Sequence, residues 1–177
     1  MARALLAWCS AESLFKVQPM YIDIKLPRET KRQAPFDRAM PGQLWLYDGA
    51  GEIVLTFGCL GKGGGNKLVP SWDWNKKGND TPTGEYTGII LGPWVPAKSY
   101  GDVEVIRLTP ITGNGLAAHK NGGRDGFAIH CGGDVLQKVL FSTEGCIRTF
   151  RRDQVRLIAA LKANHLTKDI PVKVRET

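Results

Sequence analysis

The sequence predicts a mainly β fold of the β+α class, with one long helix near its C-terminal end. At 177 residues and 42% hydrophobic, it can form one core of ordinary size. Its 21 glycines and 10 prolines indicate many turns and therefore short strands. Residues 151–164 repeat their apolar side chains at helical spacing.

The expected strands are short runs that alternate apolar and polar residues or are continuously apolar. They are residues 20–26, 43–48, 52–57, 86–91, 103–108, 127–130 and 170–174. A Gly-Ala-Gly turn at 49–51 predicts that the second and third form a hairpin. Pro171 predicts an edge position for the last run, because proline cannot donate to a sheet ladder. Residues 112–125 are rich in Gly, Asn and Lys and are expected to form a loop.

The expected helix at 151–164 packs on the sheet. Val155, Ile158 and Leu161 are predicted to line its buried face, with Leu157 four positions before Leu161. Thr149 is predicted to act as N-cap.

Two regions are expected along the chain. Residues 1–40 are interpreted as an N-terminal appendage, with a short amphipathic helix at 2–15 and a linker at 28–37, and residues 41–177 as the main domain. The apolar run at 4–8 is shorter than the roughly 7–15 residues of a signal-peptide core. No run approaches the roughly 18 apolar residues of a membrane helix. We therefore expect a soluble chain with no clear signal peptide and no membrane partner.

The net charge is +7, from 24 basic and 17 acidic residues, which favours an anionic partner. Its densest basic cluster is Arg148, Arg151 and Arg152. Nucleic acid is not expected, because no helix-turn-helix, zinc-finger or RNA-binding aromatic motif is present. No cofactor is expected either, since the glycine-rich run at 61–65 lacks the Walker spacing.

A histidine and a cysteine carry the candidate chemistry. His130 ends an apolar run, and Cys146 follows a polar turn at 142–145. A thiol and an imidazole are the parts of a cysteine nucleophile with its base. Nearby arginines and a following helix predict a lowered pKa for Cys146. The alternatives are a buried, inert cysteine and a core histidine. A zinc site from His130, Cys131, Cys146 and Cys59 is a further alternative, though adjacent ligands on a strand face opposite ways.

Together these residues resemble a known family. His130 followed by Ser-Thr-Glu-Gly-Cys-Ile-Arg at 142–148 is similar to the L,D-transpeptidase (YkuD-type) signature, with a His–Cys separation of 16 (146 minus 130). The Asp-Thr-Pro-Thr-Gly-Glu-Tyr turn at 80–86 resembles that family's upstream motif. The resemblance covers about residues 42–175. It implies a β-sandwich or partly open barrel with one helix in the C-terminal region.

A branch of this family that is deployed as type VI secretion cell-wall toxins is similar at 105–110, at Gly123 and Arg124, and at 127–130. That likeness implies an antibacterial effector delivered by a secretion system and acting in the periplasm. An immunity protein or a secretion adaptor is then a candidate partner.

The implied activity is acyl transfer on peptidoglycan stem peptides, as an L,D-transpeptidase or L,D-carboxypeptidase. Cys146 would be the nucleophile, His130 the base, and the N–H groups of Gly145 and Cys146 the oxyanion hole. The implied substrate-binding residues are Arg148, Ser142, Thr143, Glu144 and Cys131, and no metal is implied.

Two positions depart from the family pattern. Glu144 replaces the histidine that usually precedes Gly-Cys, and Cys131 replaces the glycine that follows the base histidine. In the family, the main-chain carbonyl of the latter residue orients the imidazole, and cysteine has one too. A carboxylate beside Cys146 opposes thiolate formation. The alternative function is therefore a catalytically lapsed peptidoglycan-binding domain in which Glu144 quenches the thiol.

Overall fold

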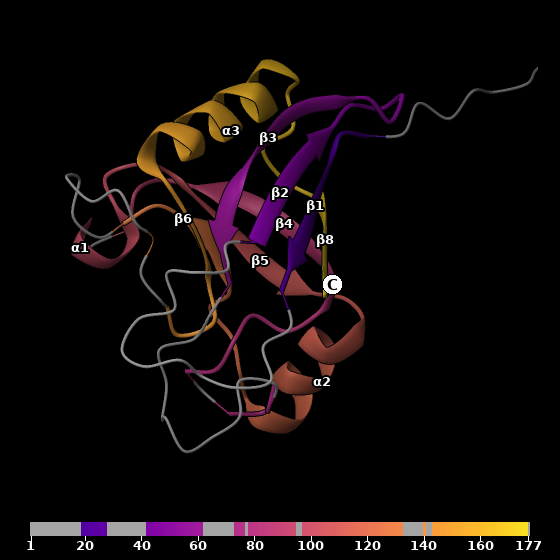
Figure 1. Cartoon of the computed structure of the whole chain (residues 1–177), viewed down its shortest axis with the longest axis vertical. Coiled ribbons are helices and arrows are strands. Elements are labelled where there is room, and N and C mark those ends of the chain that lie inside the picture. Colours follow the sequence, from indigo (N-terminus) through magenta and orange to yellow (C-terminus); the bar gives the residue numbers. More distant parts are fainter. Residues whose placement is uncertain are drawn as a thin grey trace, which may run out of the picture.

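Eight strands form a closed barrel, in the order β1-β2-β3-β7-β6-β5-β4-β8 (Figure 1). This computed structural model describes residues 19–27, 42–61, 73–76, 78–94, 97–132, 140 and 143–176. The strands are β1 (Tyr21–Leu26), β2 (Gly42–Tyr47), β3 (Ile53–Leu60), β4 (Gly84–Leu91), β5 (Val105–Pro110), β6 (Ala128–His130), β7 (Ile147–Thr149) and β8 (Ile170–Glu176). The helices are α1 (Ala97–Tyr100), α2 (Gly113–Gly122) and α3 (Arg151–Ala163). The predicted mainly β class is confirmed, and the barrel is closed rather than partly open.

The first strand belongs to the barrel. β1 pairs antiparallel with β2 and parallel with β8, so both of its edges are satisfied. The strand predicted at 20–26 is therefore confirmed, but the domain boundary predicted at residue 40 is wrong for this segment. The remaining predicted features of the first forty residues, a helix at 2–15 and a linker at 28–37, lie outside the described residues.

β8 is an interior strand, contrary to the edge position predicted from Pro171. It lies between β1 and β4. Proline is accommodated because the pairing with β1 begins only at Val172, one residue later. The side chains of Asp23 and Arg175 add an ion pair across β1 and β8, with Nε to Oδ1 at 3.0 Å.

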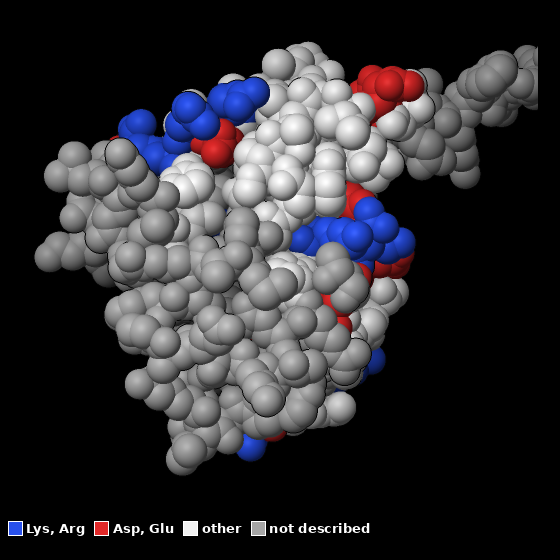
Figure 2. Space-filling model, viewed as in Figure 1, with Lys and Arg blue, Asp and Glu red and all other residues white. Residues whose placement is uncertain are grey.

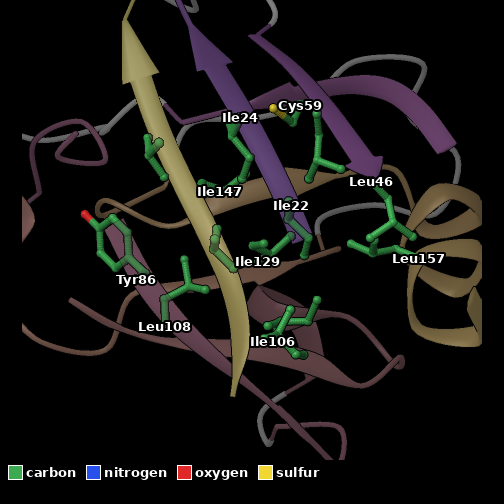
Figure 3. Packing of buried hydrophobic residues seen from close by; sticks show 14 of the residues in the cluster. Ile22, Ile24, Leu46, Cys59, Tyr86, Ile106, Leu108, Ile129, Ile147 and Leu157 are labelled. Atoms are coloured by element: carbon green, nitrogen blue, oxygen red, sulfur yellow. The ribbon is translucent and has the colours of Figure 1, made fainter. Parts of the chain in front are cut away.

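Alternation along the strands builds the core. In β2, Leu44 and Leu46 are buried while the residues between them are partly exposed, as the sequence predicted. Figure 3 shows side chains from strands all around the barrel meeting in one cluster, which Leu157 of α3 joins beside Leu46. The helix at 151–164 is confirmed, and Leu157, Ile158 and Leu161 are buried as predicted. Val155 departs from the prediction, because it is 42% exposed.

The start of α3 also differs from the prediction. Thr149 lies in β7, and the N-cap residue is Phe150. The Thr149 hydroxyl instead donates to the side-chain oxygen of Gln154 (2.9 Å). Gln154 Nε2 donates to the carbonyls of Glu104 (3.0 Å) and Ile129 (3.2 Å). These bonds tie the first turn of α3 to the strands that carry the candidate site.

Helix α2 occupies most of the segment predicted to be a loop. Only Gly115 and Ala118 of this helix are buried, so no apolar stripe marks it in the sequence. Gly115 packs against the ring of Tyr86, where an added Cβ would lie 2.4 Å from the phenol oxygen. The helix ends at Gly123, which adopts a left-handed φ of 59°. Tertiary packing therefore determines this helix.

Charged side chains on the outer face of α3 are visible in Figure 2. Arg151 forms a bidentate pair with Asp102, and Arg152 and Arg156 flank Asp153 at 3.5 and 3.6 Å. The predicted basic cluster is thus divided, because Arg148 is buried beside the candidate site. In the described part of the chain, no helix combines the length and apolar character needed to cross a membrane.

Candidate active site

Strands β6 and β7 bring the predicted histidine and cysteine to one face. They pair in parallel, with Ile129 opposite Ile147 and His130 opposite Arg148. Both isoleucines belong to the barrel core, so His130 and Arg148 point to the outside. Cys146 directly precedes β7 and lies two residues before Arg148, on the same side. This register separates the Cα atoms of His130 and Cys146 by roughly 8 Å, a gap that their side chains can span.

The imidazole of His130 is buried and held by its neighbour. It is 2% exposed, and Nδ1 lies 2.6 Å from the carbonyl oxygen of Cys131. Because a carbonyl only accepts, Nδ1 carries the proton and Nε2 the lone pair. Burial, with a smaller contribution from the charge of Arg148, lowers the pKa of His130 to about 4, although the hydrogen bond to Cys131 acts in the opposite direction. His130 is therefore a neutral acceptor at pH 7.

Cys131 contributes its carbonyl rather than its side chain. Its thiol is 1% exposed and packs against Gly101, where a Cβ would lie 2.4 Å from Sγ. The predicted substrate-binding role of Cys131 stays a prediction, and its buried thiol gives it no support. The predicted use of its carbonyl to orient the imidazole is confirmed.

An aromatic ring packs against His130, and a second ring packs against the first. Tyr100 of α1 lies with its ring centroid 5.0 Å from that of the imidazole, and Trp94 packs edge-on against Tyr100 at 4.9 Å. Burial raises the pKa of the Tyr100 phenol, with further contributions from Cys146 and Glu144. Neither aromatic residue was predicted as part of the site, because nothing in their sequence spacing connects them to His130.

The Cys146 thiol is half-buried, and Sγ donates to the carbonyl of Gly126 at 3.5 Å. Burial raises its pKa above the ordinary value, which corrects the predicted lowering. The charges of Arg148 and Arg124 oppose this effect, and that of Glu144 adds to it. The expected helix effect is absent because all of β7 separates the thiol from the start of α3.

Two arginines that follow β7, Arg151 and Arg152, were expected to lower the pKa of the thiol, but their side chains do not lie beside it. Arg151 is engaged by Asp102, and the side chain of Arg152 is 83% exposed. Since the pKa of the thiol is raised and that of the imidazole is lowered, Cys146 and His130 are each neutral at rest.

The turn before Cys146 is braced from within. Thr143 is 8% exposed, and its hydroxyl accepts from the Gly145 N–H (3.1 Å) and donates to the Cys146 carbonyl (2.7 Å). Thr143 is thus a brace rather than the predicted substrate contact. In this conformation the Gly145 N–H is also engaged, so it does not serve as the predicted oxyanion donor. Glu144 is exposed at the tip of the turn, and Ser142 lies outside the described residues.

Arg148 is 9% exposed, and its Nη2 donates to the carbonyl of Ser99 at 3.3 Å. Its Nε has no hydrogen-bond partner among the described residues. Burial lowers the pKa of its guanidinium. A buried, incompletely satisfied guanidinium beside the thiol is suited to bind a carboxylate.

A second buried arginine lies beneath the turn, and the sequence analysis assigned it no role. Arg124 is 3% exposed. Its Nη1 donates to the carbonyl of Trp74 (2.7 Å) and its Nη2 to that of Asn79 (3.1 Å). Both Nη atoms also lie 3.3 Å from the Asp80 carbonyl. Glycine at 145 signals a close approach, but only the fold reveals that Arg124 makes it.

Within the part of the chain that is described, no group of three or more His, Cys, Asp or Glu side chains converges to hold a metal ion. The zinc site considered for His130, Cys131, Cys146 and Cys59 therefore does not form. Cys59 lies opposite Thr149, between β3 and β7, and burial raises its pKa to about 12.

No protein-family model matches the chain, and no curated protein matches it by sequence. A solved structure with a similar fold is that of Bdellovibrio bacteriovorus Bd1075, with a TM-score of 0.51 and 16% sequence identity. The match covers 89% of this chain and 50% of that one, so this chain spans half the length of the Bdellovibrio protein. At this identity the likeness concerns the fold alone.

Proposed function

We propose that the protein is a cysteine acyltransferase that acts on peptidoglycan stem peptides, as an L,D-transpeptidase, an L,D-carboxypeptidase or both. The fold expected from this proposal is the L,D-transpeptidase-like barrel. One observation supports the proposal most. Cys146 directly precedes β7, whose Arg148 pairs with His130 of β6, and the Cys131 carbonyl holds Nδ1 of that histidine, which leaves Nε2 as the proposed base. The substrate class comes from the resemblance of the sequence motifs, and of their order, to the L,D-transpeptidase signature.

The proposed reaction begins from the neutral pair. The thiol turns from the Gly126 carbonyl towards Nε2 of His130, which accepts its proton as Sγ attacks the carbonyl that follows the L-centre of the stem diamino acid. The peptide C–N bond then breaks, and the leaving D-alanine amine takes the proton from Nε2. Water or an acceptor amine attacks the thioester and gives a proton to Nε2. The C–S bond breaks, and His130 reprotonates Cys146.

The neutral resting state has a kinetic consequence. Because the pKa of Cys146 is raised and that of His130 is lowered, a thiolate–imidazolium pair is unfavourable before substrate binds. Proton transfer therefore accompanies attack on the carbonyl. This places the enzyme closer to serine-type general-base catalysis than to a cysteine protease with a preformed thiolate.

Arg148 is proposed to bind the terminal carboxylate of the stem peptide. Its Nε lacks a partner among the described residues, while Nη2 is already held by Ser99. A carboxylate that accepts from Nε would complete the hydrogen bonding of the guanidinium. The leaving residue would then be the one with the free carboxylate.

A second candidate function is a wall-binding domain without catalysis. The raised pKa of Cys146, to which Glu144 contributes, favours it, as does the engaged N–H of Gly145. In this case the site would retain peptide but not cleave it.

Mass spectrometry of purified muropeptides after incubation with the protein tests the proposal. We expect tetrapeptide stems to lose D-alanine or to become cross-linked, and a Cys146→Ala variant to do neither. Stems left intact by the wild-type protein would refute catalysis. If the wild-type protein is inactive, its cosedimentation with purified wall sacculi would support the second candidate function, a wall-binding domain.

The family branch named above also suggests action in the periplasm as an antibacterial effector. Expression in a susceptible bacterium, with and without an added export signal, tests this. Growth should stop only when the wild-type protein is exported, and exported Cys146→Ala should be harmless. Toxicity that persists in the Cys146→Ala strain would contradict the proposed route of killing.

A further inference from the structure

The turn that presents Cys146 rests on a buried cation. Gly145 has a φ of +112°, and a Cβ there would lie 2.1 Å from Nη2 of Arg124 and 3.1 Å from the Asn79 carbonyl oxygen. The absence of a side chain at 145 thus lets the main chain touch the guanidinium directly. Phe127 covers the other side of the cation, with its ring centroid 5.2 Å from Cζ of Arg124.

The guanidinium also holds a second segment against the same turn. Two of its carbonyl partners, Asn79 and Asp80, directly precede Thr81, and the third, Trp74, lies seven residues before it. Thr81 Oγ1 lies 3.0 Å from the Gly145 carbonyl and 3.1 Å from that of Gly61. Segment 78–81 is therefore held by Arg124 through its carbonyls and contacts the turn before Cys146 through the Thr81 hydroxyl.

We propose that Arg124 is a positioning residue for the reactive thiol: its buried guanidinium holds segment 78–81 and Gly145 in the arrangement that presents Cys146, and provides a fixed positive charge beneath the forming thiolate. This rests on the proposed function only in taking Cys146 as the nucleophile. Main-chain carbonyls satisfy the donors without consuming the charge, as a carboxylate would. A cation already in place needs no reorganisation when negative charge develops on sulfur.

The electrostatic surroundings agree with this role. The positive charge of Arg124 lowers the pKa of Cys146 against the larger effect of burial. Several charged or titratable groups surround the pair. Those around Arg124 are Tyr86, Asp80 and Cys146, and those around Cys146 are Arg148, Arg124, Glu144, Tyr100 and His130.

The rate of alkylation of Cys146 by iodoacetamide, followed from about pH 6 to 10 in the full-length protein, tests the inference. Mass spectrometry of the peptide that contains residue 146 separates this thiol from the other three cysteines. We expect Arg124→Met to react roughly tenfold more slowly at neutral pH, with its pH midpoint moved upwards. Arg124→Lys should restore much of the midpoint but not the full rate, because an ammonium cannot bridge the same carbonyls.

Arg152→Met is the matched control, since it removes an arginine whose side chain is 83% exposed. It should leave both midpoint and rate unchanged. A folded Arg124→Met protein with the wild-type profile would overturn the inference and leave the proposed function intact. If wild-type Cys146 reacts no faster than the buried cysteines at any pH, the proposed function fails instead.

The positioning of the turn can be tested separately from the charge of Arg124. Thr81→Val keeps Arg124 and deletes only the hydroxyl that lies between Gly61 and Gly145. We expect slower alkylation with an unchanged midpoint, because the charge remains while the turn is less constrained. If Arg124→Met does not fold, this variant and Arg124→Lys decide the question. Wild-type rates in both would overturn the inference.

Discussion

Acidification should destabilise this protein through one buried side chain. His130 is 2% exposed, and its pKa falls from the ordinary 6.5 to about 4 in the folded state. Between these two values the unfolded chain binds a proton that the folded protein excludes. Stability is therefore fully present above pH 6.5 and is lost as the pH falls towards 4. Below that pH both states carry the proton, and this contribution no longer changes.

The size of the effect follows from the difference between the two pKa values. One pH unit is worth about 1.4 kcal/mol, so lowering the pKa from 6.5 to about 4 corresponds to about 3 kcal/mol. That is a large fraction of the roughly 5–15 kcal/mol by which a folded domain is usually stable.

Urea unfolding at a series of pH values measures it. Carboxylates also titrate in this range, so the informative quantity is the difference between the wild type and His130→Gln, which lacks the titrating group. The wild type should lose about 3 kcal/mol more than His130→Gln between pH 6.5 and 4. His119→Gln, at an exposed position, is the matched control substitution. Parallel curves for the wild type and His130→Gln would refute the reasoning that burial keeps the imidazole neutral.

Three further substitutions test the packing around the site, and a fourth, Gly51→Ala, is the control for the first. Gly145→Ala combines a left-handed φ with a Cβ 2.1 Å from Arg124 Nη2, and should cost about 3 kcal/mol or more in urea unfolding. Gly51→Ala, also left-handed but with open space around it, should cost only about 1 kcal/mol; equal losses would contradict the steric part. Gln154→Leu removes three buried hydrogen bonds and should cost about 3 kcal/mol, and a neutral result would show that they contribute little. Cys131→Ala should cost about 1 kcal/mol yet leave the pH dependence of Cys146 alkylation unchanged, whereas a shifted profile would mean that the thiol itself acts on the site.

Local patterns in the sequence predicted most strands but not how they close. Leu44 and Leu46 alternate with partly exposed residues, and this period is visible in any short window. By contrast, β1 pairs with β8 through residues such as Ile22 and Val172, and the local sequence around either residue does not predict its partner. The same limitation led to the incorrect edge assignment of Pro171. Helix α2 was missed because glycines and polar residues form it, and its contact with Tyr86 lies far away in the sequence.

The candidate site shows the same division. His130 and Cys146 were predicted from the chemistry of the residue types and their spacing, and the role of the Cys131 carbonyl came from the family resemblance. The pKa of Cys146 was predicted in the wrong direction, because desolvation depends on everything that packs over the thiol. The role of Arg124 was missed for a related reason, since its partners come from a segment about fifty residues earlier.

The parallel pairing of β1 with β8 also affects how the chain can fold during synthesis. Asp23 and Arg175, which form an ion pair across these strands, are 152 positions apart in the sequence. Until residues 170–176 leave the ribosome, the edges of β1 and β4 have no neighbour, and such edges can pair with other chains. Contacts this distant in sequence also slow folding, because a long loop must close before they form. Chaperone protection of these two edges is therefore most valuable while the last strand is still being made.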